Sequence, residues 1–364
     1  MERELQEAVN ERISVEEDED KLHMITHPER YLEIVRLWSK VAWMRQNWTF
    51  QRLLSRALDR DRFIAYFEAL PSDEERARLR SYLGPLSTIP HLTVPSCQAY
   101  VLTDAEYVWL INTRLGRRQP STLELGPYCT CAAGTAIGRG HHLRVCKKGG
   151  GPLRVHDNCR DVLQKCGRNA GVVSKTEEPL VLPGTEERPG DVIYDGIGQG
   201  GGDLVVDVTV VDTFSGFDTL SQREVLKRSL KVGASARMAE KNKSNKKGGP
   251  HKEEMWVRIQ RQGKEFFPVG FETSGASTSQ CNKLLKKLSE IAHQRRGHNK
   301  AYFILRWRAT LAMTLAKKGA EVALSRTYKV RRGQRGVRGI EEVDEDSGPL
   351  LDVDAEAFIH GGTD

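Results

Sequence analysis

The stretch RPGDVIYDGIGQGGGDLVVDVTVVD, residues 188–212, contains two apolar runs that each carry an aspartate. Asp191 opens the run Val-Ile-Tyr, and Asp207 interrupts the longer run of residues 204–211. Both runs predict β-strands, and the glycine-rich residues 196–202 between them predict a turn. Aspartate is depleted in strands, and a buried carboxylate is costly unless it is paired or binds a metal. The two aspartates therefore need a chemical explanation.

The period of a strand places Asp207 on the same face as Val205 and Thr209. If its strand pairs in antiparallel fashion with the strand that begins at Asp191, the two carboxylates converge at one edge of the sheet. Adjacent carboxylates repel each other, and a hard divalent cation such as Mg²⁺ relieves that repulsion. The alternative is a turn aspartate at position 191 and a solvent-facing one at position 207.

The composition is typical of a globular protein with polar flanks. The chain has 364 residues, of which 38% are hydrophobic, enough for two or three domains. No apolar run reaches the ~20 residues that span a bilayer, and the acidic start lacks the apolar core of a signal peptide. We therefore expect an intracellular protein without a membrane partner, whose seven cysteines stay reduced or bind metal.

The charge is divided unevenly along the chain. The net charge is +7, but residues 339–364 carry nine acidic and no Lys or Arg side chains, so residues 1–338 carry +16. A basic body with an acidic end favours a polyanionic partner. A basic surface that serves only solubility is the alternative.

Shifts in composition predict five segments. We expect a disordered acidic lead (1–24), a helical region (25–118), a Cys- and His-rich segment (119–152), an α/β core (153–326) and a disordered tail, rich in Arg and Gly and then acidic (327–364).

Capping signals support the helical region. Ser72 is placed to cap the segment SDEERARLRSYL. Thr103 and Glu106 form a capping box before a helix that Gly116 ends.

The predicted core alternates helices and strands. A helix over 155–170 places one apolar stripe on the core side: Val155, Cys159, Val162, Leu163 and Cys166. We expect strands around 171–182, 191–195 and 203–211, then a basic helix from the capping box at Ser221 to about Lys246, a strand at 264–273 and a helix at 277–296. The order helix, three mostly antiparallel strands, helix, strand predicts an α/β fold.

The segment CTCAAGTAIGRGHHLRVC, residues 129–146, has the residue types of a zinc site. Three thiolates and one imidazole are the donor set of a closed, structural Zn²⁺ site, here Cys129, Cys131, His142 and Cys146. His142 has the favoured spacing to Cys146, and His141 is the fallback ligand. Unrelated reduced thiols are the alternative.

The order of these motifs resembles a known nuclease pattern. Arg-Pro-Gly-Asp at 188–191, a gap of fifteen residues and Asp-Val-Thr-Val at 207–210 resemble the PD-(D/E)xK nucleases. More narrowly, the chain resembles the restriction-like endonuclease domain at the C-terminus of certain non-LTR retrotransposon polyproteins, which carries a Cys-Cys-His-Cys knuckle upstream of its core. The segments LTDAEYVWLINTRLG and FFPVGFETSG also match, so the resemblance covers about residues 75–320.

The resemblance implies a restriction-endonuclease-like core and a metal-dependent DNA endonuclease. Asp191 and Asp207 would hold a catalytic Mg²⁺ or Mn²⁺, and the zinc knuckle would hold a structural Zn²⁺. The superfamily places a lysine two residues after the second acid, where this chain has Thr209. The resemblance then implies a lysine from the following helix, Lys246 first and Lys243 next.

Two further positions belong to the predicted catalytic set. Glu272, at the end of the last strand, matches an acid of the family pattern and either assists metal binding or caps the next helix. His156 lies in a Val-His-Asp element where the family has Arg-His-Asn/Asp, so the family arginine is missing or displaced to Arg154.

The basic stretch KRSLKVGASARMAEKNKSNKKGGPHK, residues 227–252, suits contacts with phosphates that read no sequence. We predict that double-stranded DNA is bound by Arg154, Arg160, Lys227, Arg228, Lys231 and Lys241. A solvated, lysine-rich helix is the alternative.

The chain contains no Tyr/Phe-x-Asp-Asp motif of a reverse transcriptase. The resemblance therefore implies a nuclear endonuclease that nicks target DNA to prime reverse transcription by another domain or chain, with element RNA as a further partner. The alternatives are a catalytically decayed, zinc-dependent nucleic-acid-binding protein with the same fold, and an interaction protein with incidental cysteines.

Overall fold

The computed structural model describes residues 47–87, 89–92, 101–122, 141–146, 150–176, 190–213, 229–248 and 253–334, with the single positions 129, 131, 148, 224 and 227. The predicted acidic lead, the acidic end of the tail and the start of the capping box at Ser221 lie outside these residues. The chain divides into two compact units, Met1–Ala69 and Leu70–Asp364. Within the first unit, the structure describes the helix α3 (Asn47–Ala69).

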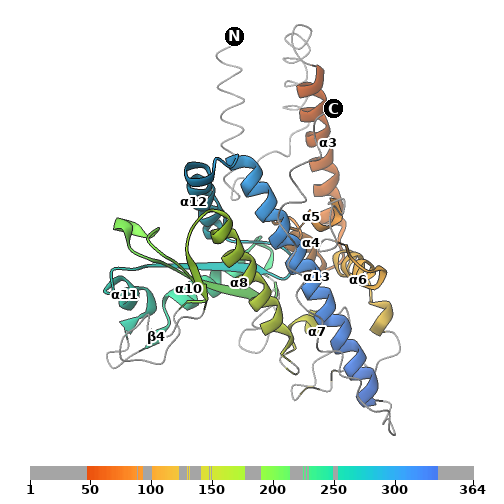
Figure 1. Cartoon of the computed structure of the whole chain (residues 1–364). Helices are drawn as coiled ribbons and strands as arrows, with labels where there is room; N and C mark the ends of the chain where they lie inside the picture. The colour runs from red at the N-terminus through yellow and green to blue at the C-terminus, as the bar shows by residue number, and fades with distance from the viewer. Residues whose placement is uncertain are drawn as a thin grey trace. The chain divides into compact units, whose positions relative to one another are not determined.

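The second unit contains all the other described elements, shown in Figure 1. Its helices are α4 (Asp73–Ser81), α5 (Ile89–Leu92), α6 (Asp104–Leu115), the 3₁₀ turn η3 (Pro120–Thr122), α7 (His141–Val145), α8 (Gly151–Asn169), the 3₁₀ turn η4 (Gln199–Gly201), α10 (Ala234–Ser244), α11 (Met255–Gln260), α12 (Ser279–Arg296) and α13 (Lys300–Gln334). Its strands are β1 (Ser174–Thr176), β2 (Val192–Tyr194), β3 (Leu204–Val211), β4 (Lys247–Gly248), β5 (Glu253–Glu254) and β6 (Glu265–Glu272).

The division of the chain after Ala69 falls within the segment 25–118 that the sequence predicted as helical. Helix α6 belongs to the same unit as the core because its Trp109 is buried with Ala320 and Ala323 of α13. Capping sets the ends of the short helices as expected. Ser72 Oγ accepts a hydrogen bond from the Glu75 amide at 3.2 Å, and both bonds of the capping box before α6 are present.

The main sheet has the strand order β1-β2-β3-β6. Each neighbouring pair among the first three strands is antiparallel, as predicted, and β6 runs parallel to β3 over eight residues. Parallel neighbours need a crossover connection, and helices α10 and α11 lie in the chain between them. Pro268, which has no amide hydrogen, is tolerated because β6 is an edge strand.

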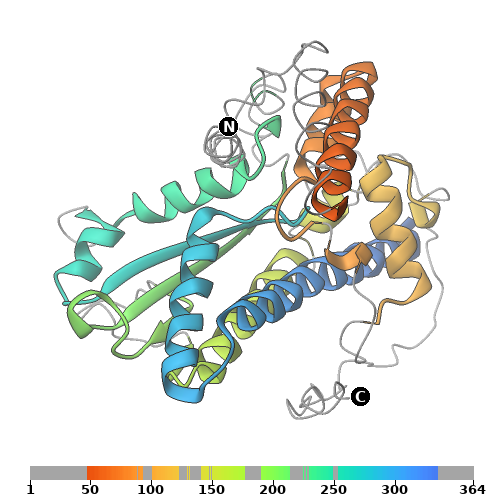
Figure 2. The same ribbon diagram turned by 90° about the horizontal axis from the view of Figure 1, so that it is seen from above.

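Helices cover both faces of this sheet, as Figure 2 shows. Leu204, Val206 and Val208 of β3 face a core built by α8, α12 and α13, and the predicted stripe of α8 is buried in it. Val205 points to the opposite face and packs against Ile259 of α11. The same alternation directs Asp207 toward the face that α10 and α11 cover.

Two predicted boundaries are wrong. The basic helix does not run from residue 221 to 246, because residues 230–233 are not helical and Gly233 adopts a left-handed conformation (φ +69°) before α10 begins. Helix α10 then ends at Ser244, before Lys246. At the other end, α13 continues through residue 326, where we expected the tail, because Ala323 and Arg326 are buried within the fold. Among the described residues, no helix combines the length and apolar character needed to cross a membrane.

Candidate functional site

Asp191 lies one residue before the start of β2, at the limit of the pairing between β2 and β3. The pair Val192–Val206 is the last in register, and the Asp191 amide donates to the Val206 carbonyl at 2.8 Å. Gly190 allows this approach, because a Cβ there would lie 2.3 Å from Val205 Cγ1. Past the Val192–Val206 pair, no strand among the described residues pairs with β3 on this side. Asp191 Oδ2 takes that place and accepts a hydrogen bond from the Val208 amide at 2.6 Å.

Asp207 is 7% exposed and lies close enough to Asp191 for the two carboxyl groups to share a hydrogen bond. Lys243 Nζ of α10 lies 2.9 Å from Asp207 Oδ1. Burial and the neighbouring Asp191 raise the pKa of Asp207 to about 7, and Lys243 opposes the shift. The sheet thus brings the two aspartates of the opening stretch into one site.

His156 of α8 is the second cationic partner of the site. Its Nε2 lies 3.1 Å from Asp191 Oδ2 and 3.1 Å from the Val208 carbonyl, and its Nδ1 lies 3.1 Å from Asp157 Oδ1. Burial alone would lower the pKa of His156, but Asp191 and Asp157 raise it to about 9. Conversely, the pKa of Asp191 is lowered. Burial alone would raise it, but the hydrogen bond and the positive charge of His156 lower it by more.

The donor set suits a hard divalent cation. Carboxylate oxygens are the ligands that Mg²⁺ prefers, and Mn²⁺ accepts them too. Two acids meet here, each with a cationic neighbour. Among the described residues, a group of three or more side chains that could bind one ion occurs only in the Cys/His site, so this site offers just two protein ligands. A cation bound by Asp191 and Asp207 would therefore need water or substrate oxygens as further ligands, which is usual for Mg²⁺.

Two residues of the predicted catalytic set lie elsewhere. Glu272 pairs in register with Val211, four residues beyond Asp207, which is about 13 Å along a strand. It is 1% exposed, and its Oε1 accepts from the Ser235 amide at 3.0 Å, so it caps α10 rather than the helix that follows it. Lys246 lies beyond the end of α10, so Lys243 and not Lys246 meets Asp207.

The predicted DNA-binding residues divide into two groups. Arg154, Lys227, Lys231 and Lys241 are exposed, as a phosphate contact requires. Arg160 is instead held between acids: its guanidinium lies 2.9 Å from Asp161 Oδ1 and 3.5 Å from Asp157 Oδ1. Arg160 therefore supports the Asp157 that holds His156, a role the sequence did not indicate. Arg228 lies outside the described residues.

The Cys/His site gathers the four residues that the sequence proposed as zinc ligands. Their ligand atoms all lie within 4.8 Å of one another: Cys129, Cys131, His142 and Cys146. The Cys129 and Cys146 sulfurs are 3.8 Å apart, and Cys131 Sγ lies 3.3 Å from His142 Nε2. Two sulfurs bound to one tetrahedral Zn²⁺ at ~2.3 Å lie about 3.8 Å apart, which matches the Cys129–Cys146 distance, so the cluster could hold Zn²⁺. The favoured His142 belongs to the cluster.

The cluster is anchored by residues that sequence reasoning missed. Arg326 of α13 donates from Nη2 to Cys129 Sγ at 3.2 Å, across 197 positions of sequence. Cys129 and Cys146 are buried with Leu143 and with Trp109 of α6. Burial and Cys129 raise the pKa of the Cys146 thiol. No local signal in the sequence placed Arg326 beside a cysteine.

A comparison with models of known protein families found no match, and a comparison with curated proteins found none either. The fold and the two sites are therefore interpreted from their geometry.

Proposed function

We propose that this chain is a metal-dependent DNA endonuclease of retrotransposon origin that nicks target DNA to prime reverse transcription. The observation that carries the proposal is the meeting of Asp191, Asp207 and Lys243 at the rim of one sheet. Two acids and a lysine on a mixed sheet match the residue types of the PD-(D/E)xK pattern, although the lysine comes from α10 rather than from β3.

The residues of the site have separable roles in this reaction. Bound Mg²⁺ or Mn²⁺ would polarise the scissile phosphodiester and lower the pKa of an attacking water. Asp191 and Asp207 offer the oxygen ligands. His156 fixes the orientation of Asp191, since it bonds both its carboxylate and the Val208 carbonyl. The Lys243 ammonium lies beside Asp207 and can stabilise negative charge that develops on the phosphate.

The exposed basic residues would position the duplex. Arg154 lies two residues before His156, and Lys241 lies two residues before Lys243. Both are exposed, on the same helices α8 and α10 that carry His156 and Lys243. Phosphate contacts of this kind release counterions, so binding should weaken steeply with salt. The zinc knuckle would hold a structural Zn²⁺.

A plasmid-nicking assay with Mg²⁺ or Mn²⁺ tests the proposal. Supercoiled plasmid is incubated with the full chain, with Asp207→Ala and with Asp203→Ala, a control at the aspartate before β3 that pairs with Lys264 rather than with a residue of the site. Loss of nicking in Asp207→Ala alone, with DNA binding retained in a gel-shift assay, supports the nuclease. Nicking that is equal in Asp207→Ala and the wild type would show that another protein or another site cuts the plasmid.

The second candidate is a zinc-dependent nucleic-acid-binding protein with the same fold and no activity. The ion pairs of Asp191 with His156 and of Asp207 with Lys243 favour it, because they satisfy both acids without a metal. Salt-sensitive DNA binding without nicking by the wild type, under Mg²⁺ and Mn²⁺ alike, would select this function.

A further inference from the structure

Arg144 connects the Cys/His site with the strand that carries Asp207. It lies in α7 between the ligand positions His142 and Cys146, and its guanidinium reaches Asp212, one residue beyond the end of β3. Arg144 Nη2 lies 3.1 Å from Asp212 Oδ2, and the two side chains are 6% and 4% exposed. This is a buried ion pair between the two candidate sites.

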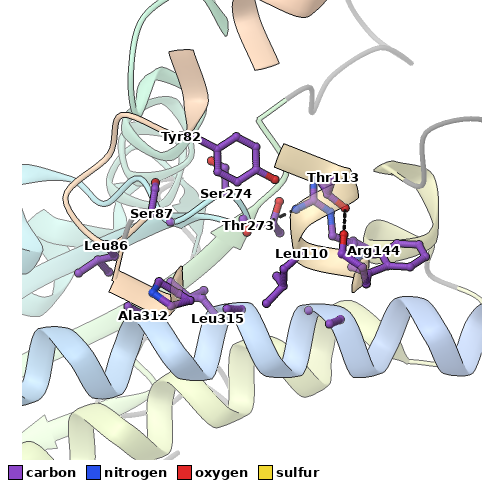
Figure 3. A pocket seen from close by; sticks show the side chains of 16 residues that line it. Tyr82, Leu86, Ser87, Leu110, Thr113, Arg144, Thr273, Ser274, Ala312 and Leu315 are labelled. Carbon is purple, nitrogen blue, oxygen red and sulfur yellow. Dashed lines mark hydrogen bonds between the residues drawn. The ribbon is translucent and has the colours of Figure 1, made fainter. Parts of the chain in front are cut away.

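The same arginine also reaches the end of β6. Its Nη1 donates to the Thr273 carbonyl at 3.4 Å, and Thr273 Oγ1 donates to Asp212 Oδ2 at 2.9 Å. Asp212 and Thr273 follow directly after the parallel strands β3 and β6. Figure 3 shows Arg144 and Thr273 beside Tyr82 and Ser274 around one cavity. One guanidinium therefore ties the carboxyl ends of two neighbouring strands to α7.

Burial makes this contact hard to give up. Removing one partner from a buried ion pair leaves a charge without compensation in a medium of low dielectric constant, which is strongly unfavourable. The position of Arg144 depends on α7, and α7 is flanked by two ligands of the Cys/His site. The position of Asp212 depends on β3, in which Asp207 lies five residues upstream.

We propose that the Arg144–Asp212 pair couples zinc binding in the Cys/His site to the placement of β3 and its catalytic aspartate. Arg144 is a positioning residue: it touches neither substrate nor metal. The part of the inference that concerns Asp207 rests on the proposed function. Coupling between two sites is reciprocal, so a change at Asp212, which is not a ligand, weakens zinc binding, and loss of zinc weakens cation binding at Asp191 and Asp207.

The first measurement is the zinc affinity of the full chain, by competition with a chromophoric chelator. We compare Asp212→Asn with Glu321→Gln, which removes the same charge from the half-exposed pair with Lys318 on α13. We expect Asp212→Asn to weaken zinc binding about fivefold or more and Glu321→Gln to leave it unchanged. Equal zinc affinities in the two variants, or no zinc binding by the wild type, would overturn the proposal.

The second measurement is Mn²⁺ affinity by electron paramagnetic resonance, in zinc-loaded and zinc-free protein. In the wild type we expect zinc removal to weaken Mn²⁺ binding about fivefold or more. The double variant Arg144→Met/Asp212→Leu replaces the pair by apolar groups, which buried sites tolerate, so it serves even if Asp212→Asn does not fold. In the double variant, zinc removal should leave the Mn²⁺ affinity unchanged; a wild-type-like drop would sink the coupling. A wild type that binds zinc as expected but no Mn²⁺ would overturn the proposed metal chemistry, while the shifted zinc affinity of Asp212→Asn would still support the link to β3.

Discussion

Lys243 and Asp207 are separated by 36 positions of sequence, yet Lys243 Nζ lies 2.9 Å from Asp207 Oδ1. Helix α10 achieves this because it crosses the face of the sheet on which Asp207 lies. Glu240, one turn earlier on the same helix, accepts a hydrogen bond from the Gly270 amide of β6 at 2.8 Å. The two contacts fix α10 over the parallel pair β3 and β6, and so fix the lysine.

If the proposed reaction is correct, Lys243→Met should reduce nicking about a hundredfold, because it removes the cation proposed to stabilise the phosphate. The matched control is Lys246→Met, which removes the same charge from the position that the sequence favoured but that lies beyond α10. Initial nicking rates at saturating Mg²⁺ measure both. A loss confined to Lys246→Met would refute the assignment made from the structure.

The stability of the metal-free protein should depend on pH through Asp207. Burial and Asp191 raise the pKa of Asp207 to about 7 in the folded state, above its usual value of 3.8. The folded protein therefore binds the proton of Asp207 more tightly than the unfolded protein does. The stabilisation that this proton gives the folded protein is lost as pH rises from 3.8 toward 7. Relative to the wild type, Asp207→Asn should gain on the order of 4 kcal/mol in unfolding free energy between about pH 4 and pH 8, measured by urea denaturation.

Asp203→Asn provides a control of opposite sign. Partial burial acts upward on the pKa of Asp203, but Lys264, 3.1 Å away, lowers it overall. The stability that this group contributes is present above its usual pKa and is lost as pH falls. Asp203→Asn should therefore lose stability relative to the wild type as pH rises. The same slope for both variants would contradict the account of Asp207.

His156→Gln should destabilise the protein most at low pH. The pKa of His156 is raised from 6.5 to about 9, against the effect of burial, by Asp191 and Asp157. Stability from the charged imidazole is fully present below pH 6.5 and is lost as pH rises through about 9. Urea unfolding at pH 6 and pH 10 measures the difference. A pH-independent cost for His156→Gln would exclude the charged form.

Zinc content tests the Cys/His site separately from catalysis. The purified wild type should contain one zinc ion per chain by mass spectrometry, and Cys131→Ser and His142→Ala should each reduce that content. Cys281→Ala is the control, because Cys281 is buried in the main core and not in the cluster. Retention of zinc in Cys131→Ser and loss in Cys281→Ala would place the metal elsewhere.

Local patterns were enough for part of the secondary structure, although they missed α13. The stripe of α8, the capping box at Thr103, the strand alternation around Asp207 and the apolar face of α12 each depend on neighbours within a few residues. The four Cys and His positions were found for the same reason, because they lie within eighteen residues of one another. Signals of this range survive in the folded protein when no tertiary contact opposes them.

The sequence by itself determined that one aspartate opens and another interrupts an apolar run typical of a strand, and that one short segment carries a tetrahedral donor set. Only the tertiary structure decided which lysine meets Asp207, that Glu272 caps α10 instead of joining the acids, that Arg160 supports His156, and that Arg144 and Arg326 tie the Cys/His site to the rest of the fold. The physical reason is range. Each of these contacts depends on how whole helices pack on the sheet. The left-handed Gly233 sets where α10 begins, and the length of α13 sets which of its residues reach the Cys/His site. Neither feature leaves a pattern in the residues that make the contact.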